Sequence, residues 1–248
     1  MLSIIIPTRN EEDYLPLLLG SIEKQTFGSY ELIVADKNSE DGIRQIAEKY
    51  GSRVVEGGFA AQARNNGAKV SRMETLLFMD ADTILPDENF LTESFREFNE
   101  RNLDIAGTLQ IPIPTGKKLR DLQYSFFYGL ANRVMLLYEN SKKPFMQICM
   151  FVKRDVFEDL GRFDETLTWA EDSELSKRGV SKNYKFGILR NCGKVWASPR
   201  KFENEGALKI ALKCFYLNVG RMLGNEFREG NFVRWGDNYD YHQSKEVN

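Results

Sequence analysis

Two aspartates, Asp80 and Asp82, follow directly on an apolar run at residues 75–79. Such a run predicts a buried strand, which places both carboxylates on the loop at its carboxyl end. Mg²⁺ and Mn²⁺ prefer oxygen ligands and commonly combine one or two carboxylates with the phosphates of a substrate. The pair therefore predicts a divalent-metal site for a phosphate-bearing ligand, with an acidic capping turn as the alternative.

A third carboxylate, Asp36, also ends an apolar run, at residues 31–36. At the edge of a parallel sheet an aspartate can accept hydrogen bonds from a ribose or from a base N–H. The alternative is an ordinary turn residue at the end of a strand.

The scaffold for these residues is predicted by apolar, β-branched runs that alternate with amphipathic segments in the first half of the chain. The alternation indicates a mostly parallel sheet with helices on both faces, whose ligand site lies at the carboxyl ends of the strands. The expected strands are residues 2–7, 31–36, 53–56 and 75–79, and the expected helices lie around 15–22, 43–47, 60–70 and 89–101.

The second half of the chain is less regular. No linker rich in glycine or proline separates it from the first, so we predict one α/β domain over residues 1–248, in which 1–113 bind a nucleotide and 114–248 shape an acceptor site. The expected strands are residues 105–113, 147–152, 185–189 and 194–198, and the expected helices are 119–138, 154–160, 171–178 and 206–223.

Composition narrows the classes of function. A net charge of −2 argues against a dedicated nucleic-acid binder, which needs a concentrated basic face. The three cysteines have no metal-ligand or redox spacing and are expected to be buried thiols in a reducing compartment. The N-terminal apolar run is too short for a signal peptide, so we expect a cytoplasmic protein, with the inner face of a membrane as a further location.

Catalytic signatures of other classes are missing from the sequence. His242 is the single histidine, and neither Gly-x-Ser-x-Gly nor His-Glu-x-x-His occurs, which excludes Ser-His-Asp and zinc hydrolases. No Gly-x-Gly-x-x-Gly follows the first predicted strand, which disfavours an ordinary dinucleotide-binding fold.

Five segments, in order along the chain, resemble motifs of the family 2 glycosyltransferases, which have the GT-A fold and invert the anomeric centre of the sugar. One departure is Ile43, which stands where the family commonly has threonine. The segments are SIIIPTRNEE at residues 3–12, ELIVAD with S-x-D-G at 31–42, ARNNG at 63–67, DADT at 80–83, and G-x-FDE with the later ED at 161–172.

The resemblance implies a nucleotide-sugar donor, either a UDP-sugar or a GDP-sugar. Asp36 would then contact the base, Arg64 would lie beside the base or diphosphate, and Asp82, with Asp80, would hold Mn²⁺ or Mg²⁺. The donor-binding residues that it implies are Pro7, Thr8, Arg9, Glu11, Asp36, Arg64, Asp80, Ala81 and Asp82.

The resemblance also implies an acceptor side. Asp172 would be the general base, and the start of a helix favours its ionised form. Glu171 and Trp169 would line the acceptor, Trp169 by stacking on a sugar face or else by packing in the core. His242 would complete the metal shell.

The acceptor is expected to be a glycan, a lipid-linked molecule or a small molecule that offers a hydroxyl or phosphate. Two other functions stay open. A nucleotidylyltransferase would want a glycine-rich loop after the first strand, where this chain has Pro7-Thr8-Arg9-Asn10. A nucleotide-sugar-binding module without turnover would not require both Asp82 and Asp172.

The predicted helix at 119–138 is rich in tyrosine and phenylalanine and is preceded by Lys117. One interpretation is a core helix with a basic cap; the other is a helix on a membrane surface, with aromatics in the interface and cations on anionic headgroups. The last predicted helix, with Lys209 and Lys213, permits the same two interpretations.

Overall fold

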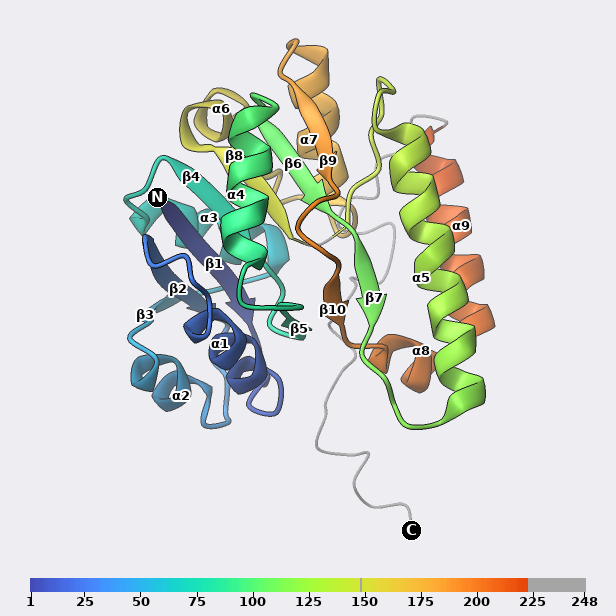
Figure 1. The fold of residues 1–248 in the computed structure, drawn as a ribbon, viewed down its shortest axis with the longest axis horizontal. Helices are drawn as coiled ribbons and strands as arrows, with labels where there is room; N and C mark the ends of the chain where they lie inside the picture. The colour runs from blue at the N-terminus through green and yellow to red at the C-terminus, as the bar shows by residue number, and fades with distance from the viewer. Residues whose placement is uncertain (148, 223–248) are drawn as a thin grey trace.

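The computed structural model describes residues 1–147 and 149–222, which form two sheets surrounded by helices (Figure 1). The larger sheet has the strand order β3-β2-β1-β4-β8-β6-β9, and only β8 runs antiparallel to its neighbours. Its strands are β1 (Leu2–Thr8), β2 (Tyr30–Asp36), β3 (Arg53–Glu56), β4 (Thr75–Phe78), β6 (Ile105–Thr108), β8 (Met150–Lys153) and β9 (Phe186–Leu189). The predicted mostly parallel sheet is confirmed.

A second, three-stranded sheet has the order β5-β10-β7. Its strands are β5 (Thr83–Ile84), β7 (Gln110–Pro112) and β10 (Val195–Ala197). The prediction of one strand over 105–113 is wrong, because the chain leaves the large sheet after β6 and enters the small one as β7. There the side-chain amide of Asn132 both accepts from Gln110 N (3.1 Å) and donates to Gln110 O (2.7 Å), which satisfies the backbone as a neighbouring strand would.

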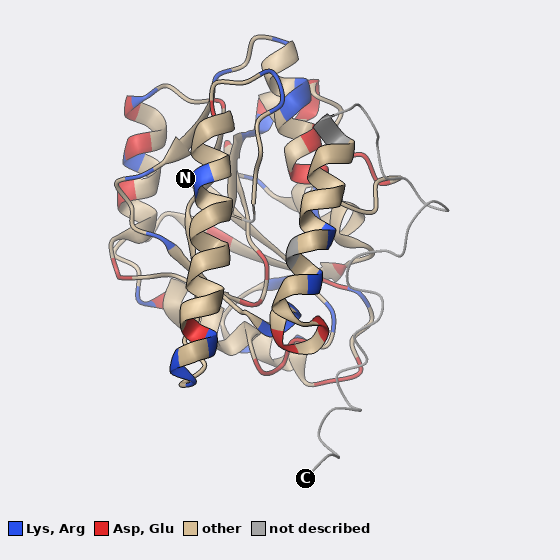
Figure 2. Ribbon diagram, turned by 90° about the vertical axis from the view of Figure 1, so that its right-hand side faces the viewer, with Lys and Arg blue, Asp and Glu red and all other residues tan. Residues whose placement is uncertain are grey.

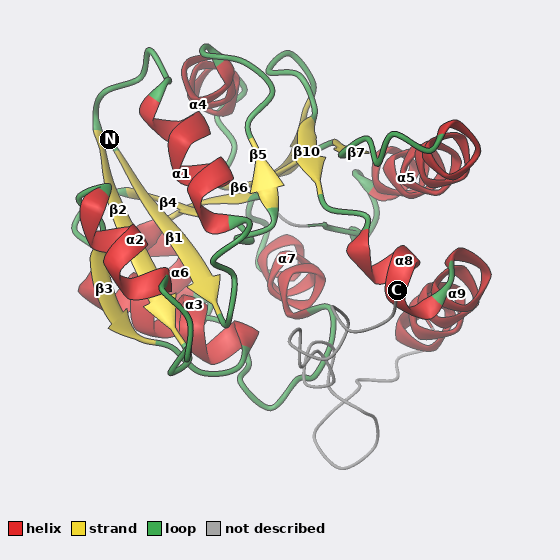
Figure 3. Ribbon diagram, turned by 90° about the horizontal axis from the view of Figure 1, so that it is seen from below, coloured by secondary structure: helices red, strands yellow, loops and turns green. Residues whose placement is uncertain are grey.

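Helices cover both faces of the large sheet, as predicted (Figure 3). The first face carries α1 (Leu15–Glu23), α2 (Ile43–Lys49) and α4 (Phe90–Glu100), and the second carries α3 (Ala60–Val70), α6 (Arg154–Asp159) and α7 (Glu171–Ser181).

The helices α5 (Lys118–Tyr138) and α9 (Ala207–Met222) lie side by side at one end of the molecule, and the short α8 (Arg200–Glu205) leads into α9 (Figures 1 and 2). Predicted either as a core helix or as a surface helix, α5 is buried on one face only. Its buried residues are Tyr124, Asn132 and Met135, whereas Leu119, Leu122, Phe126, Leu130 and Leu137 are exposed. Among the described residues, no helix combines the length and apolarity that a bilayer span needs.

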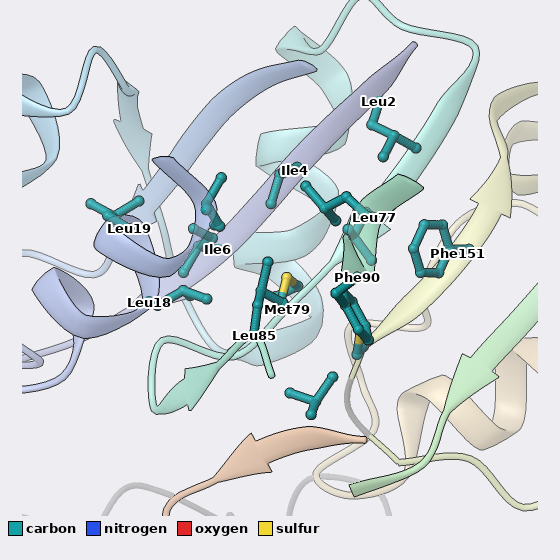
Figure 4. Close-up of a cluster of buried hydrophobic side chains, with 14 of the residues drawn as sticks. Leu2, Ile4, Ile6, Leu18, Leu19, Leu77, Met79, Leu85, Phe90 and Phe151 are labelled. Atoms are coloured by element: carbon teal, nitrogen blue, oxygen red, sulfur yellow. The ribbon is translucent and has the colours of Figure 1, made fainter. Parts of the chain in front are cut away.

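The core lies in two apolar layers, one on each face of the large sheet (Figure 4 shows the first). Strand β1 sends Ile4 and Ile6 into one layer and Ile5 into the other, all with 0% exposure. Gly67 of α3 lets that helix approach β1 closely, because an added Cβ would lie 2.4 Å from Ile5 Cγ2. This contact fixes α3, and with it Arg64 one turn earlier, against the centre of the sheet.

Of the three cysteines predicted to be buried thiols, Cys149 and Cys192 are buried, whereas Cys214 is only half-buried. Burial raises the pKa of Cys149 to about 12 and that of Cys192 to about 11. Both side chains therefore stay protonated near neutral pH and serve as small apolar groups.

Candidate active site

Carboxylates collect beyond the carboxyl ends of the parallel strands, as the sequence predicts. Asp36 ends β2 and pairs in register with Thr8, which ends β1. Asp80 and Asp82 follow β4, the neighbour of β1 on its other side. Backbone hydrogen bonding ties this loop to the small sheet, since Ser198 N donates to Asp82 O (3.0 Å).

Arg64 of α3 joins the two halves of the chain. Its guanidinium donates to Asp80 Oδ1 (2.7 Å) and to the carboxylate of Glu171, the first residue of α7. Burial alone would lower the pKa of this guanidinium, but the charges of Glu171, Asp80 and Asp172 together raise it above its ordinary value. Arg64 is therefore a fixed positive charge between the carboxylates of the loop after β4 and those at the start of α7.

A second contact joins the predicted motifs at 63–67 and 161–165. The Asn65 amide donates to Phe163 O (2.9 Å) and to Glu165 Oε1 (2.8 Å), and its oxygen accepts from Phe163 N (3.1 Å). Two segments about a hundred residues apart are thus held together by one buried side chain.

Asp172 is the second residue of α7, where the helix dipole favours a negative charge. Its Oδ1 accepts a hydrogen bond from the backbone N of Ser173 (2.6 Å). Ala170, just before the helix, has a left-handed backbone with φ 59°, which costs a non-glycine residue roughly 1–3 kcal/mol. This kink separates the half-buried Trp169 from the first turn of α7.

Arg200, at the start of α8, is a site residue that sequence reasoning missed. Its Nη1 donates to Glu11 Oε2 (2.6 Å), its Nη2 donates to Glu11 Oε1, and Nη2 also lies 3.1 Å from Asp82 Oδ2. The guanidinium carbon is 4.8 Å from the centre of the Tyr14 ring. One signal was available: Arg200 comes shortly after a predicted strand, as Asp80 and Asp82 do.

The Glu11 carboxyl shares this cluster of charges. Burial, helped by the negative charges of Asp82 and Asp80, raises the pKa of Glu11 from 4.5 to about 6, although the hydrogen bonds and charge of Arg200 lower it. Between these two values the native protein binds more protons than the unfolded chain, so its stability falls as pH rises.

We therefore expect the free energy of unfolding in EDTA to fall by up to about 2 kcal/mol between pH 4.5 and pH 6 because of Glu11 alone. Glu11→Gln has no proton to lose and should lack this decrease. Urea unfolding of both proteins across this interval measures it, because the difference between the two curves reports the titration of Glu11 together with its coupling to Asp80 and Asp82. Parallel curves for the two proteins would contradict the raised pKa.

The predicted donor-binding residues of β1 and β2 differ in their surroundings. Asp36 is fully buried and accepts from Ser39 Oγ (2.5 Å) and Arg44 Nε (2.6 Å), so a contact with a base would require an exchange of partners. The buried Thr8 hydroxyl has no hydrogen-bond partner among the described residues. Pro7 is half-buried, and Arg9 is exposed.

A divalent ion fits the carboxylates that follow β4 only if other ligands contribute. Asp80 and Asp82 supply oxygen donors, and the intervening Ala81 is buried. Within residues 1–147 and 149–222, no three His, Cys, Asp or Glu side chains form a group that could hold a metal ion. Two carboxylates completed by phosphate oxygens and water are a common arrangement for Mg²⁺. His242 lies outside the described residues.

Comparison with known proteins identifies the family. Residues 3–161 match the sequence profile of Glycosyl transferase family 2. Glycosyltransferase AglE of Haloferax volcanii is 27% identical over 195 residues, which cover 73% of this chain and 62% of AglE. Poly(ribitol-phosphate) beta-N-acetylglucosaminyltransferase TarS of Staphylococcus aureus is 27% identical over 239 residues, which cover 90% of this chain and 40% of TarS. The chain thus spans less than two thirds of each relative.

Solved structures agree with the family match. TarS residues 1–349 in complex with UDP-GlcNAc superpose with a TM-score of 0.62 and 22% identity, covering 79% of this chain and 58% of that one. Mannosyltransferase PcManGT from Pyrobaculum calidifontis, in complex with GDP-Man and Mn²⁺, gives a TM-score of 0.57 with 17% identity, covering 90% of this chain and 76% of that one. The chain belongs to glycosyltransferase family 2, and its architecture is the GT-A fold.

Proposed function

We propose that this chain transfers a sugar from a nucleotide-diphosphate donor to a hydroxyl or phosphate of an acceptor, with inversion at the anomeric carbon. The observation that carries the proposal is the position of Arg64. It pairs with Asp80 on the loop after β4 and with Glu171 at the start of α7, next to Asp172. A donor-binding loop and a candidate base are therefore held in one network of ion pairs.

The donor is a UDP-sugar or a GDP-sugar in this proposal. Support comes from the related folds, since TarS was solved with UDP-GlcNAc and PcManGT with GDP-Man and Mn²⁺. The buried Thr8 hydroxyl at the end of β1 offers a polar group to such a ligand. Pro7, Arg9 and Asp36 lie on the same strand ends or directly beyond them.

Asp82, with Asp80, would hold Mn²⁺ or Mg²⁺ together with the donor diphosphate. A divalent ion supplies positive charge that stabilises the departing nucleoside diphosphate. At present the positive charge beside Asp82 is the guanidinium of Arg200. In this proposal Arg200 would exchange Asp82 for the diphosphate on donor binding, because its planar guanidinium suits phosphate oxygens.

Asp172 would act as the base. As the acceptor oxygen forms its bond to the anomeric carbon, the bond from that carbon to the diphosphate oxygen breaks, and the acceptor proton passes to the Asp172 carboxylate. Attack opposite the leaving group inverts the configuration. Glu171 has a different task, because its carboxylate is engaged with Arg64 and so positions the start of α7.

A thermal-shift screen with UDP-, GDP- and TDP-sugars and Mn²⁺ tests the donor. A ligand at a hundred times its Kd adds about 2.7 kcal/mol of stability, so the matching sugar nucleotide should raise Tm by roughly 5–10 °C. The same sugar nucleotide should then release its nucleoside diphosphate when an acceptor is supplied. A shift without release under any acceptor would favour a binding module, and a shift with nucleoside triphosphate and sugar phosphate would favour a nucleotidylyltransferase.

A further inference from the structure

The outer face of α5 and α9 carries large apolar side chains in contact with solvent. On α5 they are spaced by three, four, four and seven residues, which places them on one stripe of the helix. Their exposed fractions are 82% for Leu119, 69% for Leu122, 67% for Phe126, 49% for Leu130 and 79% for Leu137.

Helix α9 continues this surface, because it packs beside α5 (Figure 2). The spacing is again three or four residues, with Tyr216 alongside the stripe. The exposed fractions are 68% for Leu208, 60% for Leu212, 69% for Phe215, 60% for Tyr216 and 36% for Val219. Monomeric soluble proteins rarely expose apolar groups in such a concentration, and patches of this kind mark contact surfaces.

The charges on the two helices are almost all positive. The sequence of α9 holds three lysines and arginines and no acidic residue, and that of α5 holds three with one acid, Asp121. The Asp121 carboxylate is engaged by Thr115, whose hydroxyl lies 2.7 Å away. Lys209 and Lys213 lie 3.8 Å and 3.7 Å from the Glu205 carboxylate of α8, so part of this positive charge is paired. The two helices still carry an excess of cations in a chain whose net charge is −2.

The face is also held rigid from behind. The Phe202 ring of α8 packs on three aromatic rings of α5, with centroids 5.5 Å from Tyr124, 5.8 Å from Phe127 and 5.8 Å from Tyr128. Tyr128 also donates a hydrogen bond to Ser198 O (3.2 Å). The inner aromatics of α5 thus anchor the helix, and its outer apolar residues do not contribute to the core.

We propose that the α5/α9 face lies on an anionic lipid surface, with its leucines and phenylalanines in the headgroup region and its lysines and arginines on lipid phosphates. An amphipathic helix with one apolar face and flanking cations binds in the plane of a membrane interface. A second copy of the chain is a poorer partner, because a two-fold contact would bring the cationic α9 against two helices whose single acidic residue, Asp121, is engaged by Thr115.

Co-sedimentation of the full chain with phosphatidylcholine vesicles, with and without phosphatidylglycerol, tests this. We expect sedimentation with the anionic vesicles and release by salt at about 1 M, where the Debye length is ~3 Å. The double variant Phe126→Ser/Phe215→Ser should lower the partition coefficient at least ~100-fold, from the usual transfer free energies of two apolar side chains. Lys209→Glu should lower it roughly 10-fold or more on anionic vesicles alone.

Leu17→Ser is the matched control, because Leu17 is 50% exposed on α1, at a distance from this face. It should sediment like the wild type. Circular dichroism and Tm of every variant should match the wild type, since the replaced side chains are exposed. The proposal is overturned if the wild type stays in the supernatant with anionic vesicles, or if the double variant sediments equally. A concentration-dependent dimer that the double variant abolishes would also overturn it, in favour of a second copy.

Discussion

Replacing Asp172 by asparagine is expected to lower kcat by about 10²–10⁴-fold, the usual contribution of a general base, while the Kd of the sugar nucleotide stays unchanged. Asparagine keeps the shape, and its amide oxygen can still accept the hydrogen bond from Ser173 N. It cannot take up a proton at neutral pH. Steady-state kinetics with the preferred donor, and calorimetry for donor binding, separate the two effects.

Glu174→Gln is the matched control for this experiment. It makes the same change of carboxylate to amide in the first turn of α7, at a residue whose partner is Arg178. Its kcat should remain near the wild-type value. Glu171→Gln should differ from both, because the loss of its ion pair with Arg64 disturbs donor binding as well as turnover. An active Asp172→Asn enzyme, or one that loses donor affinity instead of turnover, would show that the base is another group.

Asp82→Asn is expected to remove the divalent-ion dependence of nucleotide binding. Outer-shell partners alone usually change metal affinity by roughly 10–100-fold, so a direct ligand should cost at least that much. Calorimetric titration of the wild type and of Asp82→Asn with UDP and GDP, each in Mn²⁺ and in EDTA, gives four affinities for each nucleotide. For the nucleotide that binds, we expect the wild type in Mn²⁺ to have a lower Kd than the other three combinations. The Kd of Asp82→Asn should be the same in Mn²⁺ as in EDTA.

Asp87→Asn serves as the control. The Asp87 carboxylate lies after β5, outside the loop of Asp80 and Asp82, and accepts a hydrogen bond from Asn89 N (2.9 Å). It should retain the full effect of Mn²⁺. Four equal affinities across wild type and Asp82→Asn would refute a metal role for Asp82. Tighter binding by Asp82→Asn in EDTA would instead mean that Asp82 only repels the diphosphate.

The first half of the fold was predictable because local sequence patterns determine its helices and strands. Helix α3 and strand β3 have the bounds expected from the sequence, since apolar periodicity and turn residues define both ends. Of the small sheet, β10 lies within the strand predicted at 194–198, but β5 was not predicted and β7 was not separated from β6. Strands of two or three residues exist through pairing with distant segments, which local sequence patterns do not show.

The candidate site divides in the same way. Asp36, Asp80 and Asp82 could be predicted as candidates because each stands at or just beyond the end of a continuous apolar run. Arg200 was missed because it meets Glu11 across 189 residues of sequence, and no local pattern marks such a partner. For α5 and α9 the sequence left open whether the apolar residues are buried or exposed, since helical spacing shows that one face is apolar and does not show what covers it.

Helix α8 places two of the contacts described above within three residues of chain. Arg200 engages Glu11 and Asp82, and Phe202 packs on the aromatic rings of α5. If donor binding separates Arg200 from Asp82, the movement of α8 also shifts Phe202 against α5. A lipid surface that holds α5 in place would then change the free energy of that movement. Thermodynamic reciprocity then requires that vesicles change the affinity for the sugar nucleotide by the same factor by which the sugar nucleotide changes the affinity for vesicles.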